Sequence, residues 1–192
     1  MKIFFDTEFT GLHKGTTLIS IGMVDELGRC FYGEFTDYDV SQVSDWIREN
    51  VLSHLVLGES GYIESWKSAC KELGYDMTMV RGGRAVIVSE LRRWLSVYDD
   101  VQFVSDVCHY DFVLLIDLFG TAFDLPKNVC PSCHDINQDI AKYYGISEFE
   151  AFDKDRDVIA EHIGISRDIV KHNSLHDALM IRLIYLKVND SR

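Results

Sequence analysis

Two carboxylates one residue apart close the first apolar run of the chain. The run covers residues 3–5 after Lys2, and Asp6 and Glu8 follow it. Alternate side chains of a strand share a face, so both carboxylates would point the same way and repel each other. Oxygen ligands of this kind suit Mg²⁺ or Mn²⁺. The pair therefore indicates a divalent-metal site. The alternative is a strand that enters a polar turn, with Glu8 in solvent and Gly11 closing the turn.

Two later stretches carry further groups that could join such a site. Asp111 follows a predicted buried strand and begins an apolar helix, and His172 lies five positions before Asp177. Taken singly, Asp111 is typical of a first-turn helix acid and Asp177 of a surface acid. A histidine on a loop can take a proton from water near neutral pH. His172 and His176 both qualify, and His172 is favoured because His176 would point away from the helix face of Asp177.

The elements predicted around these residues form an α/β sheet. Hydrophobic alternation indicates an opening strand and two more, which form an antiparallel meander, followed by a buried strand. Helical periodicity indicates helices between and after the strands. The predicted strands after the first are 16–24, 29–35 and 101–105, and the predicted helices are 40–55, 84–97, 110–119, 136–144, one ending at 162, and 174–188. Residues 57–83 are hard to interpret, with a helix at 64–73 and an extended piece at 78–81 as options.

Size and composition are those of an ordinary globular protein. The chain has 192 residues, of which 47% are hydrophobic and 26% charged, so we expect a single domain over residues 1–192. The first residues do not resemble a signal peptide, and no apolar stretch approaches the ~20 residues of a membrane helix. We therefore expect a cytoplasmic protein with no membrane partner. Five scattered cysteines favour a reducing compartment over a disulfide framework.

Some polar motifs have simpler interpretations. The Cys130-x-x-Cys133-His134 stretch has the spacing of half a zinc site or of a haem attachment, but no second cysteine pair accompanies it. We interpret it as a loop leading into the next helix. Asp106 and Asp135 are interpreted as spare acids, and either could cap a helix. Lys14, Lys67, Arg81 and Arg84 are candidates for phosphate contacts.

In this order along the chain, the three acidic motifs resemble the DEDDh superfamily of 3′-5′ exonucleases, and most closely its small stand-alone exoribonucleases. The resemblance implies an RNase H-like mixed sheet flanked by helices. It also implies that Asp6, Glu8, Asp111 and Asp177 bind two Mg²⁺ or Mn²⁺ ions and that His172 is the general base. One departure is the Ser-Asp-Val-Cys-His run at 105–109, where many members carry Asn or Gly-His-Asn. Contacts to sugar or phosphate there stay open.

The predicted function follows from this resemblance. We expect a metal-dependent exoribonuclease that releases nucleoside monophosphates from the 3′ end of single-stranded or overhanging RNA. The alternatives are a DNA exonuclease or an oligoribonuclease with the same site, and a catalytically silent binding protein. The net charge of −12 argues against tight nucleic-acid binding, but bound cations would neutralise part of it. The residues expected to contact substrate are Thr7, Phe9, Gly11, Leu12 and His109, with Phe9 as plain core an equal option. A homodimer is a further option, with residues 57–83 at its contact.

Overall fold

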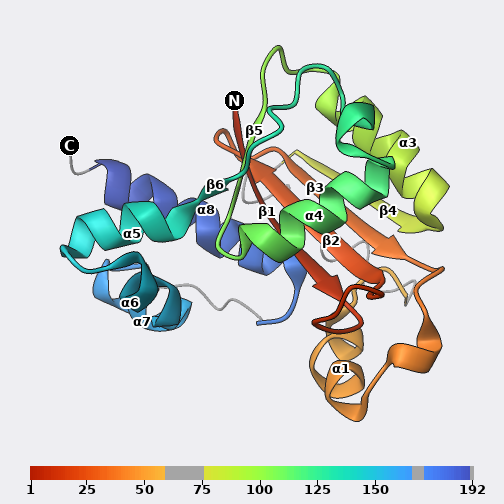
Figure 1. Cartoon of the computed structure of the whole chain (residues 1–192), viewed down its shortest axis with the longest axis horizontal. Helices are drawn as coiled ribbons and strands as arrows, with labels where there is room; N and C mark the ends of the chain where they lie inside the picture. The colour runs from red at the N-terminus through yellow and green to blue at the C-terminus, as the bar shows by residue number, and fades with distance from the viewer. Residues whose placement is uncertain (59–75, 166–170, 191–192) are drawn as a thin grey trace.

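A six-stranded mixed sheet forms the centre of the computed structural model, which describes residues 1–58, 76–165 and 171–190 (Figure 1). The strands, in the order β4-β3-β2-β1-β5-β6, have these bounds: β1 Lys2–Phe9, β2 Leu18–Asp25, β3 Cys30–Phe35, β4 Met77–Gly82, β5 Gln102–Ser105 and β6 His134–Asp135. Strands β1, β2 and β3 pair antiparallel, whereas β4, β5 and β6 each pair parallel to a neighbour. The predicted meander with added parallel strands is therefore confirmed.

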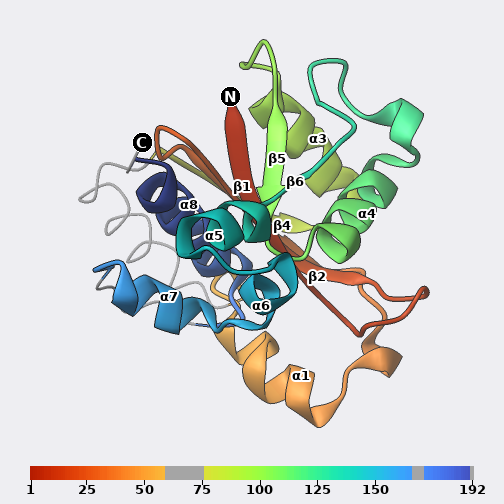
Figure 2. The same ribbon diagram turned by 60° about the vertical axis from the view of Figure 1, so that its left-hand side comes forward.

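Helices cover both faces of this sheet. The α-helices are α1 Asp45–Asn50, α3 Arg84–Leu95, α4 Cys108–Phe119, α5 Ile136–Tyr144, α6 Glu148–Asp153, α7 Arg156–His162 and α8 Ser174–Asp190, and three 3₁₀ turns are η1 Val40–Gln42, η2 Leu52–His54 and η3 Ala122–Asp124. Helix α8 lies on one face with α5, α6 and α7 beside it, and α3 and α4 lie on the other (Figure 2). Within the described ranges, none of the helices is both long enough and apolar enough to cross a membrane.

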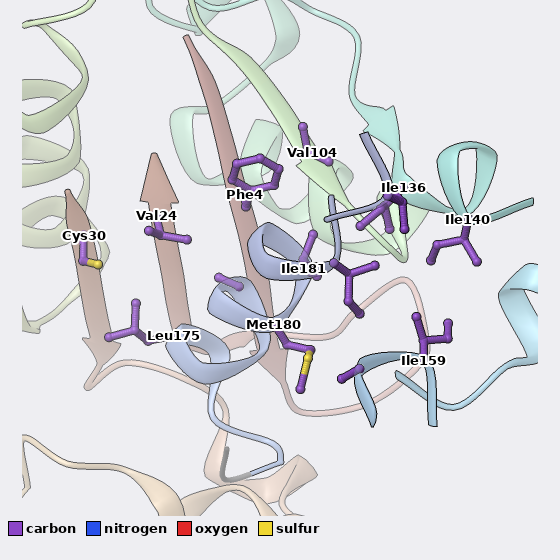
Figure 3. Close-up of a cluster of buried hydrophobic side chains, with 14 of the residues drawn as sticks. Phe4, Val24, Cys30, Val104, Ile136, Ile140, Ile159, Leu175, Met180 and Ile181 are labelled. Atoms are coloured by element: carbon purple, nitrogen blue, oxygen red, sulfur yellow. The ribbon is translucent and has the colours of Figure 1, made fainter. Parts of the chain in front are cut away.

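Strand β1 supplies the core on both faces because its side chains alternate. Phe4 packs with Val24 and Ile181 under α8 (Figure 3), whereas Ile3 and Phe5 belong to the core beneath α3 and α4. Residues two and four positions after Phe4 share its face of the strand. The alternation of β1 therefore turns its two carboxylates toward α8.

The beginning of α8 sits against the sheet at a glycine. A Cβ atom on Gly22 would lie 2.2 Å from the backbone nitrogen of Leu175 and 2.3 Å from the carbonyl of Ser174. Beside this contact, the hydroxyls of Ser20 and Ser174 share a buried hydrogen bond of 2.9 Å. Gly22 is also the β2 partner of Asp6 on β1. The missing side chain therefore lets the first turn of α8 approach the sheet directly beside Asp6.

The predicted helix over 40–55 is wrong. Three short pieces occupy this stretch, and Val43 between the first two is extended, with φ −75° and ψ 107°. The Asp39 side chain caps η1, and the Ser44 hydroxyl accepts a hydrogen bond from the Ile47 N–H at the start of α1. A serine that caps a new helix competes locally with continuation of the previous one. The apolar spacing was helical, but the cap residues divided it.

The polar stretch at 147–157 contains a helix that sequence patterning missed. Helix α6 begins after Ser147, whose hydroxyl and backbone N–H form a capping box with Glu150. This Ser-x-x-Glu spacing is a helix start signal that was present in the sequence. The extended option at 78–81 is confirmed within β4, and the helix that we predicted up to residue 162 corresponds to α7. The option of a helix at 64–73 lies outside the described residues.

Replacing Gly22 with alanine should destabilise the protein. The new methyl would overlap the backbone of α8, and overpacking of this kind costs roughly 1–3 kcal/mol. Urea unfolding would measure the change in the free energy of unfolding. Gly15→Ala is the matched control, because a Cβ atom on Gly15 would lie 3.7 Å from its nearest neighbour, the His13 Nδ1, which is an ordinary contact distance. Equal stability of the two variants would contradict the proposed close approach.

Candidate active site

Three carboxylates lie close together where the beginning of α8 packs near the carboxyl-terminal end of β1. Asp6 and Glu8 come from β1, and Asp177 comes from the first turn of α8. Each offers an oxygen atom, and the three oxygens lie within 4.8 Å of one another. The register of β1 shifts between Glu8 and Phe9, a bulge next to the carboxylates. Asp6 and Asp177, which are 171 positions apart in sequence, therefore belong to one acidic group.

Asp111 reaches the same place from the opposite face of the sheet. It lies in the first turn of α4 and is buried, with 2% of its surface exposed. The Thr7 hydroxyl donates to one carboxylate oxygen at 2.6 Å, and the Ser105 hydroxyl donates to the other at 2.7 Å. Two fixed donors on β1 and β5 hold this carboxylate in a single orientation.

Asp106 is a fifth acid at this place, so it is not the spare acid that we expected, and the option that it caps a helix is wrong. Its carboxylate lies within the same 4.8 Å limit of Asp6 and Asp111, and it accepts a hydrogen bond from Arg156 at 2.9 Å. Val107, not Asp106, occupies the N-cap position of α4. Asp135, by contrast, caps α5 as predicted, since its side chain accepts from the Asn137 N–H. No local signal distinguished Asp106, because its partners lie on other elements.

Burial and mutual repulsion raise the pKa values of these acids. Burial is the largest cause for each of the four motif acids, and it raises the pKa of Glu8 to about 8 and those of Asp111 and Asp177 to about 7. The pKa of Asp6 is raised well above its ordinary value by burial and then by the charges of Asp111, Asp177, Glu8 and Asp106. Such a group is costly as bare anions, and a cation would relieve the repulsion.

His172 lies on the wall of the same site. It lines a pocket of about 460 Å³ together with Asp6 and Asp177, and His176 is not among the residues that line this pocket. Its backbone is left-handed, with φ 58°, and its ring meets the Trp46 ring edge to face at 5.0 Å. Burial, followed by the charges of His54 and Lys171, lowers the pKa of His172. The imidazole is therefore neutral near pH 7 and able to accept a proton.

The residues that the sequence predicted to contact substrate are not among those that line this pocket. Thr7 is buried and its hydroxyl is engaged with Asp111. Phe9 is half-buried and stacks on Tyr110 with ring centroids 6.0 Å apart, so it is not plain core. Gly11 donates its N–H to the Thr16 hydroxyl in the loop after β1, where Leu12 is 71% exposed. His109 is exposed at the start of α4.

The cations beside the pocket differ from those that the sequence suggested. Lys154, Arg156 and Lys171 line it. The Arg81 Nε instead lies 3.8 Å from the Glu34 Oε2, and Arg84 forms a salt bridge with Asp117. Lys67 lies outside the described residues, and Lys14 is not among the residues that line the pocket. Pattern alone could not tell a cation beside the site from one on another face.

The cysteine motif behaves as the loop that we expected. Residues 130–133 lead into β6 and α5, and His134 pairs with Asp139 on α5. Across residues 1–58, 76–165 and 171–190, the groups close enough to hold a metal ion are two acidic ones: Asp6 with Glu8 and Asp177, and Asp6 with Asp106 and Asp111. The described cysteines Cys30, Cys108, Cys130 and Cys133 are not in disulfides.

The donor set fits hard divalent cations. All of the grouped atoms are carboxylate oxygens, which Mg²⁺ and Mn²⁺ prefer. Asp6 belongs to both groups and could serve two neighbouring ions. A neutral histidine stands on the wall of the adjoining pocket. This arrangement can support hydrolysis of a phosphate ester by a two-metal mechanism.

Comparison with known proteins identifies the family. Two curated relatives from Mycobacterium tuberculosis, of strains CDC 1551 / Oshkosh and ATCC 25618 / H37Rv, are both named 3′-5′ exoribonuclease. Each is 31% identical to this chain over 131 residues, which cover 67% of this chain and 67% of the relative. No protein-family model matches the chain.

Solved structures share the fold. The nuclease domain of 3′hExo, a DEDDh family member bound to rAMP, aligns with a TM-score of 0.65 at 10% identity, covering 99% of this chain and 92% of that one. Pop2p of S. pombe, in a form with Mg²⁺ and Mn²⁺ bound, aligns with a TM-score of 0.56 at 18% identity, covering 98% and 82%. These structures confirm the RNase H-like fold, and the 31% identity to the curated relatives shows that the chain belongs to the family of 3′-5′ exoribonucleases.

Proposed function

We propose that this protein is a divalent-metal-dependent exoribonuclease that releases nucleoside monophosphates from the 3′ end of RNA. The observation that carries the proposal is the convergence of the motif acids on Asp6, which belongs to both groups of clustered carboxylates. Four carboxylates gathered in a partly buried site have no structural use unless a cation compensates for them. The exoribonuclease relatives supply the reaction class.

In this proposal the chain holds two Mg²⁺ or Mn²⁺ ions. Glu8 and Asp177 would hold one ion, Asp111 would hold the other, and Asp6 would bridge them. When bound, the ions supply positive charge to the phosphate and lower the pKa of a water molecule. Thr7 and Ser105 keep the Asp111 carboxylate in place through their hydrogen bonds. Because these donors are already fixed, ion binding requires little rearrangement there.

His172 is the general base in this proposal. Its lowered pKa leaves a ring nitrogen without a proton at neutral pH, and that nitrogen would accept the proton of the attacking water. Asn173, the next residue, donates its side-chain amide to the His54 carbonyl at 2.9 Å and so anchors the turn before α8. The base is thereby attached to the same segment that carries Asp177.

A line of aromatic rings beside the acids offers a place for the bases of a single strand. Phe9 stacks on Tyr110, the Tyr110 and His109 rings are 5.6 Å apart, and those of His109 and Phe152 are 6.4 Å apart. Phe152 is 49% exposed and lines the pocket. Stacking contributes affinity without positive charge. This suits a chain with a net charge of −12, whose phosphate contacts would come from Lys154.

The first test is nuclease activity of two variants. Asp6→Asn removes the shared carboxylate and His172→Ala removes the base, so each should lower the rate about 100-fold or more. RNA labelled at the 3′ end should release labelled mononucleotide at once, whereas 5′-labelled RNA should shorten stepwise. His176→Ala is the matched control and should stay within a few-fold of wild type. RNA degradation at the wild-type rate by both Asp6→Asn and His172→Ala would contradict the proposal.

The same assay separates the alternative substrates. Long RNA should be degraded at least as fast as matched DNA oligomers and as shorter RNA. The ratio of the rates depends on how the 2′ hydroxyl and the upstream bases are bound. Faster cleavage of DNA would favour the DNA exonuclease, and cleavage of only the shortest RNA would favour the oligoribonuclease. Calorimetry without Mn²⁺ binding would revive the silent binding protein.

Phe152→Ala should weaken binding of single-stranded RNA. Loss of one stacking partner should raise KM about 10-fold with little change in kcat, since stacking contributes ~1–3 kcal/mol per base. Phe123, which is 99% exposed in η3 and is not among the residues that line the pocket, provides the matched control Phe123→Ala. Steady-state kinetics on a single-stranded oligomer would measure both. An unchanged KM in Phe152→Ala would remove Phe152 from the substrate path.

The stability of the metal-free protein should fall as pH rises. The pKa values of Glu8, Asp111 and Asp177 are raised to between about 7 and about 8 in the folded state, mainly by burial, and lie near ~4 in an unfolded chain. Between these limits the folded state binds more protons, so deprotonation favours unfolding.

We expect the Tm in chelator to drop between about pH 5.5 and pH 7.5, and Mn²⁺ to raise it more at the higher pH. Differential scanning fluorimetry would measure both effects. The Glu8→Gln variant should show a smaller pH dependence. A flat profile in wild-type protein would contradict the raised pKa values.

A further inference from the structure

Asp106 stands in the second acidic group, beside Asp6 and Asp111. We propose that Asp106 is a third carboxylate ligand of the cation on the Asp111 side, where Arg156 holds it in place. The inference rests on the proposed function, and it assigns a role to a residue that the family motif does not include. The observation that supports this inference is that two groups of three carboxylates share Asp6, and that Asp106 belongs to the group with Asp111.

Asp106 is held by partners from several elements. The Arg156 Nε donates to its Oδ2 at 2.9 Å, and the Asn137 amide donates to its backbone carbonyl at 2.8 Å. Arg156 also donates from Nη2 to the Asn137 Oδ1 at 2.6 Å. Its Nη1 donates to the carbonyls of Ala151 and Lys154 at 3.1 Å each. These bonds fix Asp106 at the end of β5 and join it to α5 and to the α6–α7 corner.

A purely structural ion pair would not need this location. Arg156 occupies one oxygen of Asp106, but a carboxylate has two oxygens and several lone pairs. Oxygen atoms of Asp6, Asp106 and Asp111 lie within 4.8 Å of one another, so their negative charges repel. The folded protein therefore bears a repulsive cost from Asp106. A cation among these oxygens would relieve the repulsion between the carboxylates, and this relief favours binding of the cation.

Charge matching supports the same reading. The five clustered carboxylates carry five negative charges, which two divalent cations and the Arg156 guanidinium would balance. Arg156 is then a positioning residue, since a ligating carboxylate is itself usually oriented by a hydrogen-bond partner. The pair Asp106 and Arg156 adds a ligand without adding net charge to the site.

The test is calorimetric titration of Mn²⁺ into nucleic-acid-free protein. Asp106→Asn keeps a side-chain oxygen for Arg156 and removes the charge, so one binding step should weaken by about 10-fold or more and the other should persist. The Mn²⁺ concentration for half-maximal nuclease activity should rise by a similar factor. Asp153→Asn is the matched control, because Asp153 lines the same pocket but belongs to neither group. Its Mn²⁺ affinity should stay within about twofold of wild type.

Metal-free melting curves check that Asp106→Asn is folded. If that variant is unstable, Asp106→Ser tests the same claim while leaving a hydroxyl oxygen for Arg156. Two unaltered Mn²⁺ binding steps in the folded variant would overturn the role of Asp106 and leave the proposed function intact. A wild-type protein that binds no Mn²⁺ would instead overturn the proposed function itself.

Discussion

Repulsion among carboxylates is the constraint around which this structure is built. Asp6 has four other acids near it, and burial adds to the energy of keeping them ionised. Something must hold the segments that carry these acids against this force. The apolar core does so, because Leu175 and Ile181 of α8 are completely or almost completely buried in it (Figure 3), as is Ala178. Hydrophobic packing thus keeps charges close that would separate in water.

The acids arrive by two different structural routes. Asp177 is delivered by a helix whose first turn contacts β2 at Gly22, and Arg182 further along α8 binds the carbonyls of Asp25 and Glu26 at 2.9 and 2.7 Å. Asp111 is delivered by a helix on the other face and is fixed by hydroxyl donors from the sheet. One route depends on close backbone packing and the other on hydrogen bonds. Both end at the same edge of β1.

The surroundings of the acids explain how an acidic protein could bind RNA. Cations line the pocket, but Lys171 is shared with Asp155 and Asp157, and Arg156 is engaged with Asp106. Little free positive charge therefore remains to attract a phosphate backbone in this part of the structure. In the proposed function, the rings of Phe9, Tyr110 and Phe152 would provide surface for bases instead. Affinity of this kind would be modest, which suits an enzyme that must advance along its substrate and release product.

The sequence by itself determined β1, β2, β3 and β5, most of the helices, and the four motif acids. Period-two alternation in β1 and the left-handed Gly145 that ends α5 are local effects, so a single segment carries the signal. Only the tertiary structure decided the role of Gly22 and the position of Asp106. Asp106 binds Arg156, which lies 50 positions later in the sequence. Gly22 on β2 contacts Leu175 on α8, near the other end of the chain. Such contacts depend on how elements pack, and neither residue type nor spacing encodes that packing locally.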